Sequence, residues 1–171
     1  MTIMAPAERD QDIVIQIARN FKTIKVSVPK LKKLVKTICN HFAGHETPDT
    51  RYEISIAIVD DAEILKLNSQ FLNHKRTTDC LSFDLSDTEE ESATGNRKSK
   101  IFDLVVNGEM AVRQANLRGH SSEAELALYI THGLLHNLGF DDSAPSQAQT
   151  MHETEDEILQ QLGYGLVYNR T

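Results

Sequence analysis

The chain has 171 residues, of which 40% are hydrophobic and 25% are charged, and its formal net charge at pH 7 is -7. This length suits one domain, spanning residues 1–171, with one hydrophobic core. No apolar run approaches the ~20 residues that a membrane span needs, so we expect a soluble protein with no membrane partner. The negative charge argues against a general nucleic-acid coat protein, because non-specific affinity comes from cations that neutralise phosphates.

The start of the chain and its cysteines predict a reducing compartment. Residues 1–12, MTIMAPAERDQD, lack the basic and then apolar layout of a secretory signal. Cys39 and Cys80 do not form a spaced disulfide framework. We therefore expect a cytoplasmic protein.

Charge is unevenly distributed along the chain. Residues 19–36 carry seven basic side chains, Lys30 and Lys33 among them, and no acidic one, whereas residues 84–91 carry five acidic side chains. The basic segment can be the solvated face of an amphipathic helix. It can also be a surface that contacts phosphates.

Alternation of apolar and polar residues predicts a small mixed sheet. Strands are expected at 12–18, 52–59, 80–85 and 101–106, and residues 25–28 either extend the first strand or form another. Residues 86–100 are too polar to bury and should form an exposed loop.

Apolar residues at spacings of 3 and 4 predict the helices. They are expected from Pro29 until Gly44, from the cap Asp60 through Phe71, and then in succession at about 108–118, 122–138 and 146–162. Ser122, with Glu125 three residues later, fits a capping box. The predicted fold class is α+β, a small mixed sheet packed with helices.

The helix at 122–138 carries the candidate chemistry. It is apolar around most of its girth, so it should run through the core. His132 and His136 lie one turn apart on its polar stripe, where two imidazoles can hold one cation. A helix whose solvated face happens to carry two histidines would show the same spacing.

The turn after this helix adds a third candidate ligand. Gly139 suits the left-handed position that ends a helix, which would bring Asp141 or Asp142 toward the two histidines. The resulting pattern, H-x3-H-x2-G-x2-[H/D], is typical of zinc metallohydrolases with three protein ligands. We expect a metal on His132, His136 and Asp142, with His152 as a rival third ligand if the last helix folds back over the site.

One residue of the protease version of this pattern is missing. Gly133 follows the first histidine, where a metalloprotease carries the glutamate that serves as general base. Peptide hydrolysis is therefore disfavoured.

Four blocks of the sequence are distinctive: LNSQFLNHKRTTDCLSF at 67–83, DLVVNGEMAVRQANLRGHSSEAELALYITHG at 103–133, HGLLHNLGFDD at 132–142, and Met151, Glu155, Ile158, Leu159, Leu162 and Gly163. Together they resemble the YbeY endoribonucleases, also called ribosomal RNA maturation factors. They occur in the family's order and span most of the chain.

This resemblance implies a fold and an activity. The fold would be similar to that of zinc-dependent proteases, a zincin-like sheet and helices with the metal helix in the core. The activity would be that of a single-strand-specific, metal-dependent endoribonuclease acting in ribosomal RNA processing and ribosome quality control. The implied cofactor is one Zn²⁺ or another divalent ion, with no nucleotide cofactor. The implied partners are single-stranded ribosomal RNA and the ribosome or its small subunit.

Three departures of the chain from the family pattern bear on the expected chemistry. The family's third ligand is a histidine where this chain has Asp142, its phosphate-handling arginine aligns with Leu72, and its proline aligns with Thr77. One carboxylate in place of an imidazole leaves a bound divalent cation at net +1, which should lower its Lewis acidity. Arg76 is the nearest stand-in for the missing arginine.

The main hypothesis is a zinc-dependent endoribonuclease in which His132, His136 and Asp142 act through the metal and Arg76 contacts the phosphate. Lys30, Lys33 and Arg113 would guide the RNA backbone. One alternative is a non-catalytic ribosome assembly factor whose metal only stabilises the C-terminal helices. Another is a different zinc-dependent hydrolase, a peptidase included.

Overall fold

The computed structural model describes residues 12–42, 50–86, 98–165 and 167. Within these ranges the chain forms β1 (Ile13–Arg19), α1 (Val28–Phe42), β2 (Arg51–Val59), α2 (Asp61–Leu72), β3 (Cys80–Asp84), β4 (Ser99–Asn107), α4 (Gly108–Arg118), α5 (Ser122–Asn137) and α6 (Pro145–Gln161). This mixed α and β fold agrees with the expected class. None of the helices in the described ranges combines the length and apolar character that crossing a bilayer requires.

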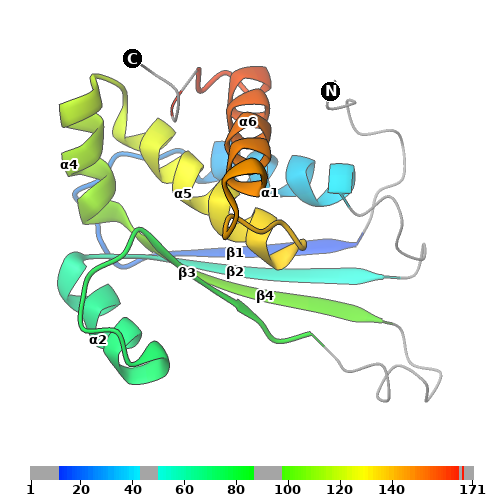
Figure 1. The fold of residues 1–171 in the computed structure, drawn as a ribbon, viewed down its shortest axis with the longest axis horizontal. Helices are drawn as coiled ribbons and strands as arrows, with labels where there is room; N and C mark the ends of the chain where they lie inside the picture. Colours follow the sequence, from blue (N-terminus) through cyan, green and yellow to red (C-terminus); the bar gives the residue numbers. More distant parts are fainter. Residues whose placement is uncertain (1–11, 43–49, 87–97, 166, 168–171) are drawn as a thin grey trace.

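The four strands form one mixed sheet in the order β1-β2-β4-β3. β1 runs parallel to β2 and β2 parallel to β4, whereas β3 pairs with β4 in the antiparallel sense. Parallel neighbours need a crossover connection, which α1 supplies between β1 and β2. α1, α4, α5 and α6 lie on one face of the sheet and α2 lies on the other (Figure 1).

Helix α5 fills the space between the sheet and the other helices. It packs against β3, β4, α1, α4 and α6. Eleven of its sixteen residues are buried, including Glu125 and Tyr129 from the polar stripe seen in the sequence. The expectation of a core helix is confirmed, and the accessible part of its polar stripe is confined to the end that carries the two histidines.

A glycine sets the distance between α5 and the sheet. A Cβ built on Gly133 would lie 2.7 Å from Sγ of Cys80 on β3 and 2.9 Å from Cδ2 of Leu104 on β4. Both distances are shorter than real Cβ contacts, so only glycine allows this approach. The residue that replaces the protease glutamate is therefore the residue that lets β3 lie against α5.

Two local predictions are wrong. Residues 25–27 form no strand, and α1 begins at Val28, because four alternating residues cannot distinguish a strand from an extended connection. The cap of α5 is Ser121, whose Oγ accepts a hydrogen bond from the amide of Ala124 at 3.0 Å, so Ser122 is already helical. The capping-box prediction missed the adjacent serine.

Most other boundaries are confirmed to within one or two residues. The side chain of Asp60 caps α2 by accepting from the amide of Glu63 at 2.9 Å. Pro145 opens α6, and Gly163 adopts a positive φ after it ends. Of the predicted loop at 86–100, residues 99 and 100 belong to β4, and residues 87–97 lie outside the described part of the chain.

Candidate metal centre

His132 and His136 present the same ring nitrogen to one point at the end of α5. Their Nε2 atoms lie 3.1 Å apart, and the two rings meet edge to face with centroids 4.6 Å apart. Both side chains are partly exposed, at 22% and 31%, so a solute can reach them. The spacing of one helical turn thus places both rings as the sequence predicted.

The turn after α5 brings one aspartate to the same point. Gly139 adopts φ +101°, and the chain reverses so that Oδ2 of Asp142 lies 3.6 Å from Nε2 of each histidine. Asp141 turns away, because its two carboxylate oxygens accept from the amide and hydroxyl of Ser143. Of the two aspartates that the sequence left open, Asp142 is the one that joins the histidines.

The three donor atoms have the spacing that a small divalent ion needs. The triangle of 3.1, 3.6 and 3.6 Å has its centre about 2.0 Å from each donor atom. Bonds from zinc to imidazole nitrogen and carboxylate oxygen are about 2.0–2.2 Å long. These three residues could hold a metal ion. Among the described residues, they are the group of His, Cys, Asp or Glu side chains whose ligand atoms lie close enough together to do so.

Hydrogen bonds on the far side of each ring make both inward nitrogens acceptors. Nδ1 of His136 donates to the carbonyl of Phe140 at 3.1 Å, and Nδ1 of His132 lies 2.6 Å from Oε1 of Glu155. A carbonyl and a carboxylate only accept, so in the neutral rings each Nδ1 carries the proton and each Nε2 carries a lone pair. Two lone pairs that face each other beside a carboxylate repel one another unless a cation lies between them. This donor set therefore fits a metal ion.

Glu155 reaches the centre from α6. Its side chain is 1% exposed, and its second oxygen accepts from Nδ1 of His152 at 3.0 Å. His152 therefore binds Glu155, and its ring stacks parallel to that of His132 with centroids 6.4 Å apart. His152, the alternative third ligand considered from the sequence, is therefore not among the three converging donors. It binds Glu155 instead.

Burial and charge act in opposite directions on His132. Burial of the ring opposes protonation, but the hydrogen bond to Glu155 and the charge of that carboxylate outweigh it and raise the pKa of His132. The charges of Asp79 and Asp142 act in the same sense. A positive charge at this ring, whether a proton or a metal ion, is favoured by its surroundings.

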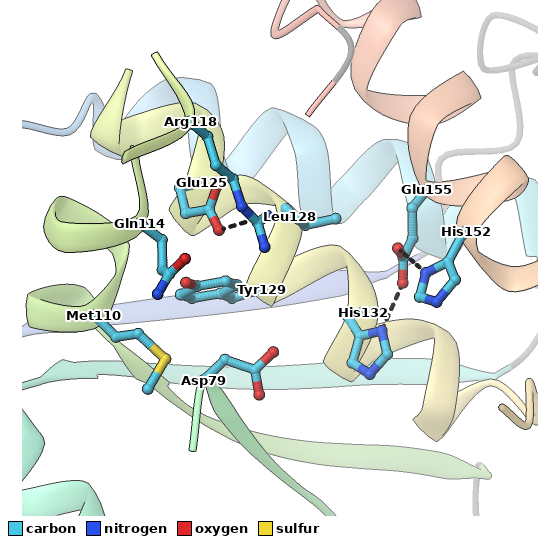
Figure 2. Close-up of a pocket in the computed structure, with 10 residues that line it drawn as sticks. All are labelled: Asp79, Met110, Gln114, Arg118, Glu125, Leu128, Tyr129, His132, His152 and Glu155. Carbon is cyan, nitrogen blue, oxygen red and sulfur yellow. Dashed lines mark hydrogen bonds and ion pairs between the residues drawn. The ribbon is translucent and has the colours of Figure 1, made fainter. Parts of the chain in front are cut away.

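A cavity of about 390 Å³ opens beside His132. Figure 2 shows its walls, to which α5, α4 and the start of β3 all contribute. Its lining residues are Asp79, Met110, Gln114, Arg118, Glu125, Leu128, Tyr129, His132, His152 and Glu155. A pocket of this size with converging polar groups can bind a small part of a substrate.

The far end of the cavity is organised by a second buried carboxylate. Glu125 is 1% exposed and binds both the ring of His120 and, at 3.2 Å, Nη1 of Arg118. Burial is the largest cause that raises the pKa of Tyr129, and the charge of Glu125 and the hydrogen bond to it act in the same direction. The hydroxyl of Tyr129 therefore stays protonated. Arg118 is 40% exposed and is the cation that lines this cavity.

Comparison with known proteins matches this chain to one family. A family model described as Endoribonuclease YbeY matches residues 16–163. The chain is 32% identical to Endoribonuclease YbeY of Thermoanaerobacter sp. strain X514 over 148 residues, which cover 82% of this chain and 93% of that protein. The chain belongs to the YbeY family. It is also 34% identical to Endoribonuclease YbeY of Clostridioides difficile strain 630, with 81% of this chain and 90% of that protein covered.

A solved structure shares the fold. The solution structure of TM1509 from Thermotoga maritima is 20% identical and covers 87% of this chain and 90% of that one, with a TM-score of 0.50. At this identity the likeness concerns the fold alone. The family model and the curated relatives, not this structure, confirm the resemblance to the YbeY family seen in the sequence.

The basic residues expected to contact RNA do not line the cavity. Arg76 lines a separate shallow hollow with His74 and Lys75. Arg113 forms a two-pronged ion pair with Asp61. The structure does not bring either guanidinium beside the histidines.

The two lysines of α1 do not line the cavity either. Lys30 lies 3.5 Å from a carboxylate oxygen of Glu123 and 4.1 Å above the ring of Tyr164. Lys33 is exposed on the same helix. These lysines can attract a polyanion to the surface without touching the candidate metal centre.

Sequence reasoning missed Glu155, Asp79 and Arg118 as members of this site. A signal was available for Glu155, because it shares a helical face with Met151, Ile158 and Leu159, all of them buried. A charged residue within an apolar stripe needs a partner. Asp79 and Arg118 carried no comparable signal, because their positions depend on how β3 and α4 pack against α5.

Proposed function

We propose that this protein is a zinc-dependent endoribonuclease that cleaves single-stranded ribosomal RNA in rRNA processing and ribosome quality control, in the cytoplasm. The observation that carries the proposal is the convergence of His132, His136 and Asp142 on one point, in a chain of the YbeY family. The names of the relatives support RNA as the substrate class. On this proposal α5 is the metal helix of a zincin-like fold.

Each residue of the candidate metal centre has a separate role in this proposal. When bound, zinc supplies Lewis acidity toward a phosphoryl oxygen and lowers the pKa of water. His132 and His136 would hold the ion through Nε2, and Asp142 would add one negative charge to the ligand set. Glu155 fixes the ring of His132, and the carbonyl of Phe140 fixes that of His136.

Recognition of the RNA backbone needs cations, and the family's arginine is absent at Leu72, the last residue of α2, which is 47% exposed. Arg118 is well placed for this role, because it lines the cavity beside His132 and is partly exposed. Farther along the bound RNA, its phosphates would be contacted by Arg76, Lys30, Lys33 and Arg113. Such contacts are electrostatic and tolerate any sequence.

The experiment uses zinc-loaded protein with a labelled single-stranded RNA and its duplex. We expect cleavage of the single strand only, and loss of cleavage in His136→Ala and Asp142→Ala. Asp141→Ala is the matched control, because Asp141 binds Ser143 and faces away from the centre. Cleavage that survives His136→Ala unchanged, or protein that stays metal-free in excess zinc, contradicts the proposal.

A non-catalytic assembly factor is the second candidate, and Leu72 in place of an arginine motivates it. A metal that only stabilises α5, the following turn and α6 would lower the melting temperature when chelated, together with RNA binding. Chelation of a catalytic metal abolishes cleavage while the fold and RNA binding persist. Thermal melts and RNA titrations with and without chelator separate the two.

A further inference from the structure

Asp79, the residue immediately before β3, is a fixed carboxylate with one oxygen that makes no hydrogen bond within the described residues. Its Oδ1 accepts from the amide of Cys80 at 2.8 Å and from the hydroxyl of Thr78 at 3.2 Å. Its backbone carbonyl accepts from the amide of Asn107 at 2.8 Å. Within the described residues Oδ2 has no hydrogen bond and the carboxylate has no ion-pair partner, so the group is held in place but not neutralised.

This carboxylate lines the cavity beside the candidate metal centre. Figure 2 shows it directed into the space between Tyr129 and His132. Its charge contributes to the raised pKa values of both side chains, as expected of a carboxylate near each of them. Asp79 therefore lines the same cavity as His132, from the residue that leads into β3.

The other two carboxylates of the cavity are occupied. Glu155 holds His132 and His152, and Glu125 holds Arg118 and His120. Both are buried, and each oxygen of each has a partner. Asp79 is thus the carboxylate of this cavity that, among the described residues, keeps an oxygen available to accept a proton.

The placement of Asp79 depends on Gly133. Any side chain at position 133 would collide with Cys80, the residue after Asp79, and would push the start of β3 away from α5. A glutamate at this position, as in the proteases, is incompatible with this packing. The substitution that removes one carboxylate from α5 therefore allows a different carboxylate to approach from β3.

We propose that Asp79 is the proton acceptor of the hydrolytic reaction, which rests on the proposed endoribonuclease function. One O–H bond of the attacking water breaks and its proton passes to Oδ2 of Asp79, while the water oxygen forms a bond to phosphorus. The bond from phosphorus to the leaving ribose oxygen breaks and its electron pair stays on that oxygen. The leaving oxygen takes up a proton, and Asp79 returns its own to solvent.

The test compares zinc-loaded wild-type protein with Asp79→Asn. Asparagine keeps an oxygen for the Cys80 amide but cannot accept the proton, so kcat for RNA cleavage should fall by about 10²–10⁴ while KM does not rise. Asp84→Asn, at the other end of the same strand, is the control and should cleave like wild type. Equal zinc affinity in all three proteins shows that the loss does not come from the metal.

A second measurement does not depend on cleavage. Inorganic phosphate at pH 8 is a dianion that an adjacent carboxylate repels, so zinc-loaded Asp79→Asn should bind it about tenfold more tightly than wild type. Titration calorimetry gives both affinities. Equal phosphate affinities in wild type and Asp79→Asn, or a kcat within threefold of wild type, would overturn the proposal.

The two readouts also separate this proposal from the function on which it rests. If wild-type protein cleaves no RNA, the endoribonuclease assignment fails. The phosphate titration then still decides whether Asp79 faces the phosphoryl site, because equal affinities refute that placement and tighter binding by Asp79→Asn supports it. If Asp79→Asn does not fold, Asp79→Ser, whose hydroxyl can also accept from Cys80, takes its place in both measurements.

Discussion

Glu155 accepts a hydrogen bond from Nδ1 of His132 at 2.6 Å, although the two residues lie 23 positions apart and on different helices. This contact fixes the ring and leaves Nε2 as the ligand atom. It also ties α6 to α5 through a buried charge. The candidate metal centre and the packing of the C-terminal helices are therefore one physical unit.

Removal of the negative charge of Glu155 should weaken metal binding. We expect Glu155→Gln to lower zinc affinity by about 10–100-fold, because the amide polarises the imidazole less than a carboxylate does. Competition with a chromogenic chelator measures the affinity. Glu153→Gln, which changes an exposed residue of the same helix paired with Gln149, should bind zinc like wild type. Equal affinities in the two variants would show that Glu155 has no part in metal binding.

The family's third ligand can be restored. Asp142→His should keep one zinc per chain, because the turn at Gly139 delivers position 142 whichever residue it holds. Loss of the carboxylate raises the net charge of the site from +1 to +2, so the bound water should become more acidic. The pH–rate profile should then shift to lower pH. An unchanged profile with full zinc occupancy would contradict this account of the substitution.

Gly133 should tolerate no side chain. Gly133→Ala places a methyl group 2.7 Å from Sγ of Cys80, and we expect it to lower the free energy of unfolding by about 1–3 kcal/mol. Urea denaturation measures the loss. The double variant with Cys80→Ala removes the sulfur and should recover part of it, which defines a coupling between the two positions. Strictly additive losses would mean that the strain lies elsewhere.

The ion pair of Asp61 with Arg113 predicts a pH dependence of stability. Hydrogen bonding to Arg113, against an opposing effect of burial, holds the pKa of Asp61 below its usual value. The stabilisation is therefore fully present above the ordinary aspartate pKa, near 3.8, and is lost as the pH falls through the lower pKa of the folded state.

We expect Arg113→Ala to be less stable than wild type at pH 7 and nearly as stable at pH values below the folded-state pKa of Asp61. Urea midpoints at the two pH values measure the difference. A gap between the proteins that persists in acid would mean that Arg113 stabilises the fold through packing and not through Asp61. The same variant, tested for RNA affinity at pH 7, shows whether Arg113 also guides RNA.

The elements and most ligand candidates could be read from the sequence because they depend on local chemistry. The spacing of His132 and His136, the positive φ at Gly139 and the cap at Asp60 each involve residues within one turn. Local rules failed where the signal was short, as at residues 25–28, or where two serines competed for one cap. Membership of the YbeY family was also accessible, because its motifs are contiguous.

Only the tertiary structure decided what surrounds the ligands. Asp142 rather than Asp141 or His152 joins the histidines because Asp141 is held by Ser143 and His152 by Glu155. Glu155 reaches His132 from a different helix, and Asp79 lines the cavity beside His132 from the residue before β3. Side chains brought together by packing between distant elements leave no periodic trace along the chain, since the distance between them is set by the core.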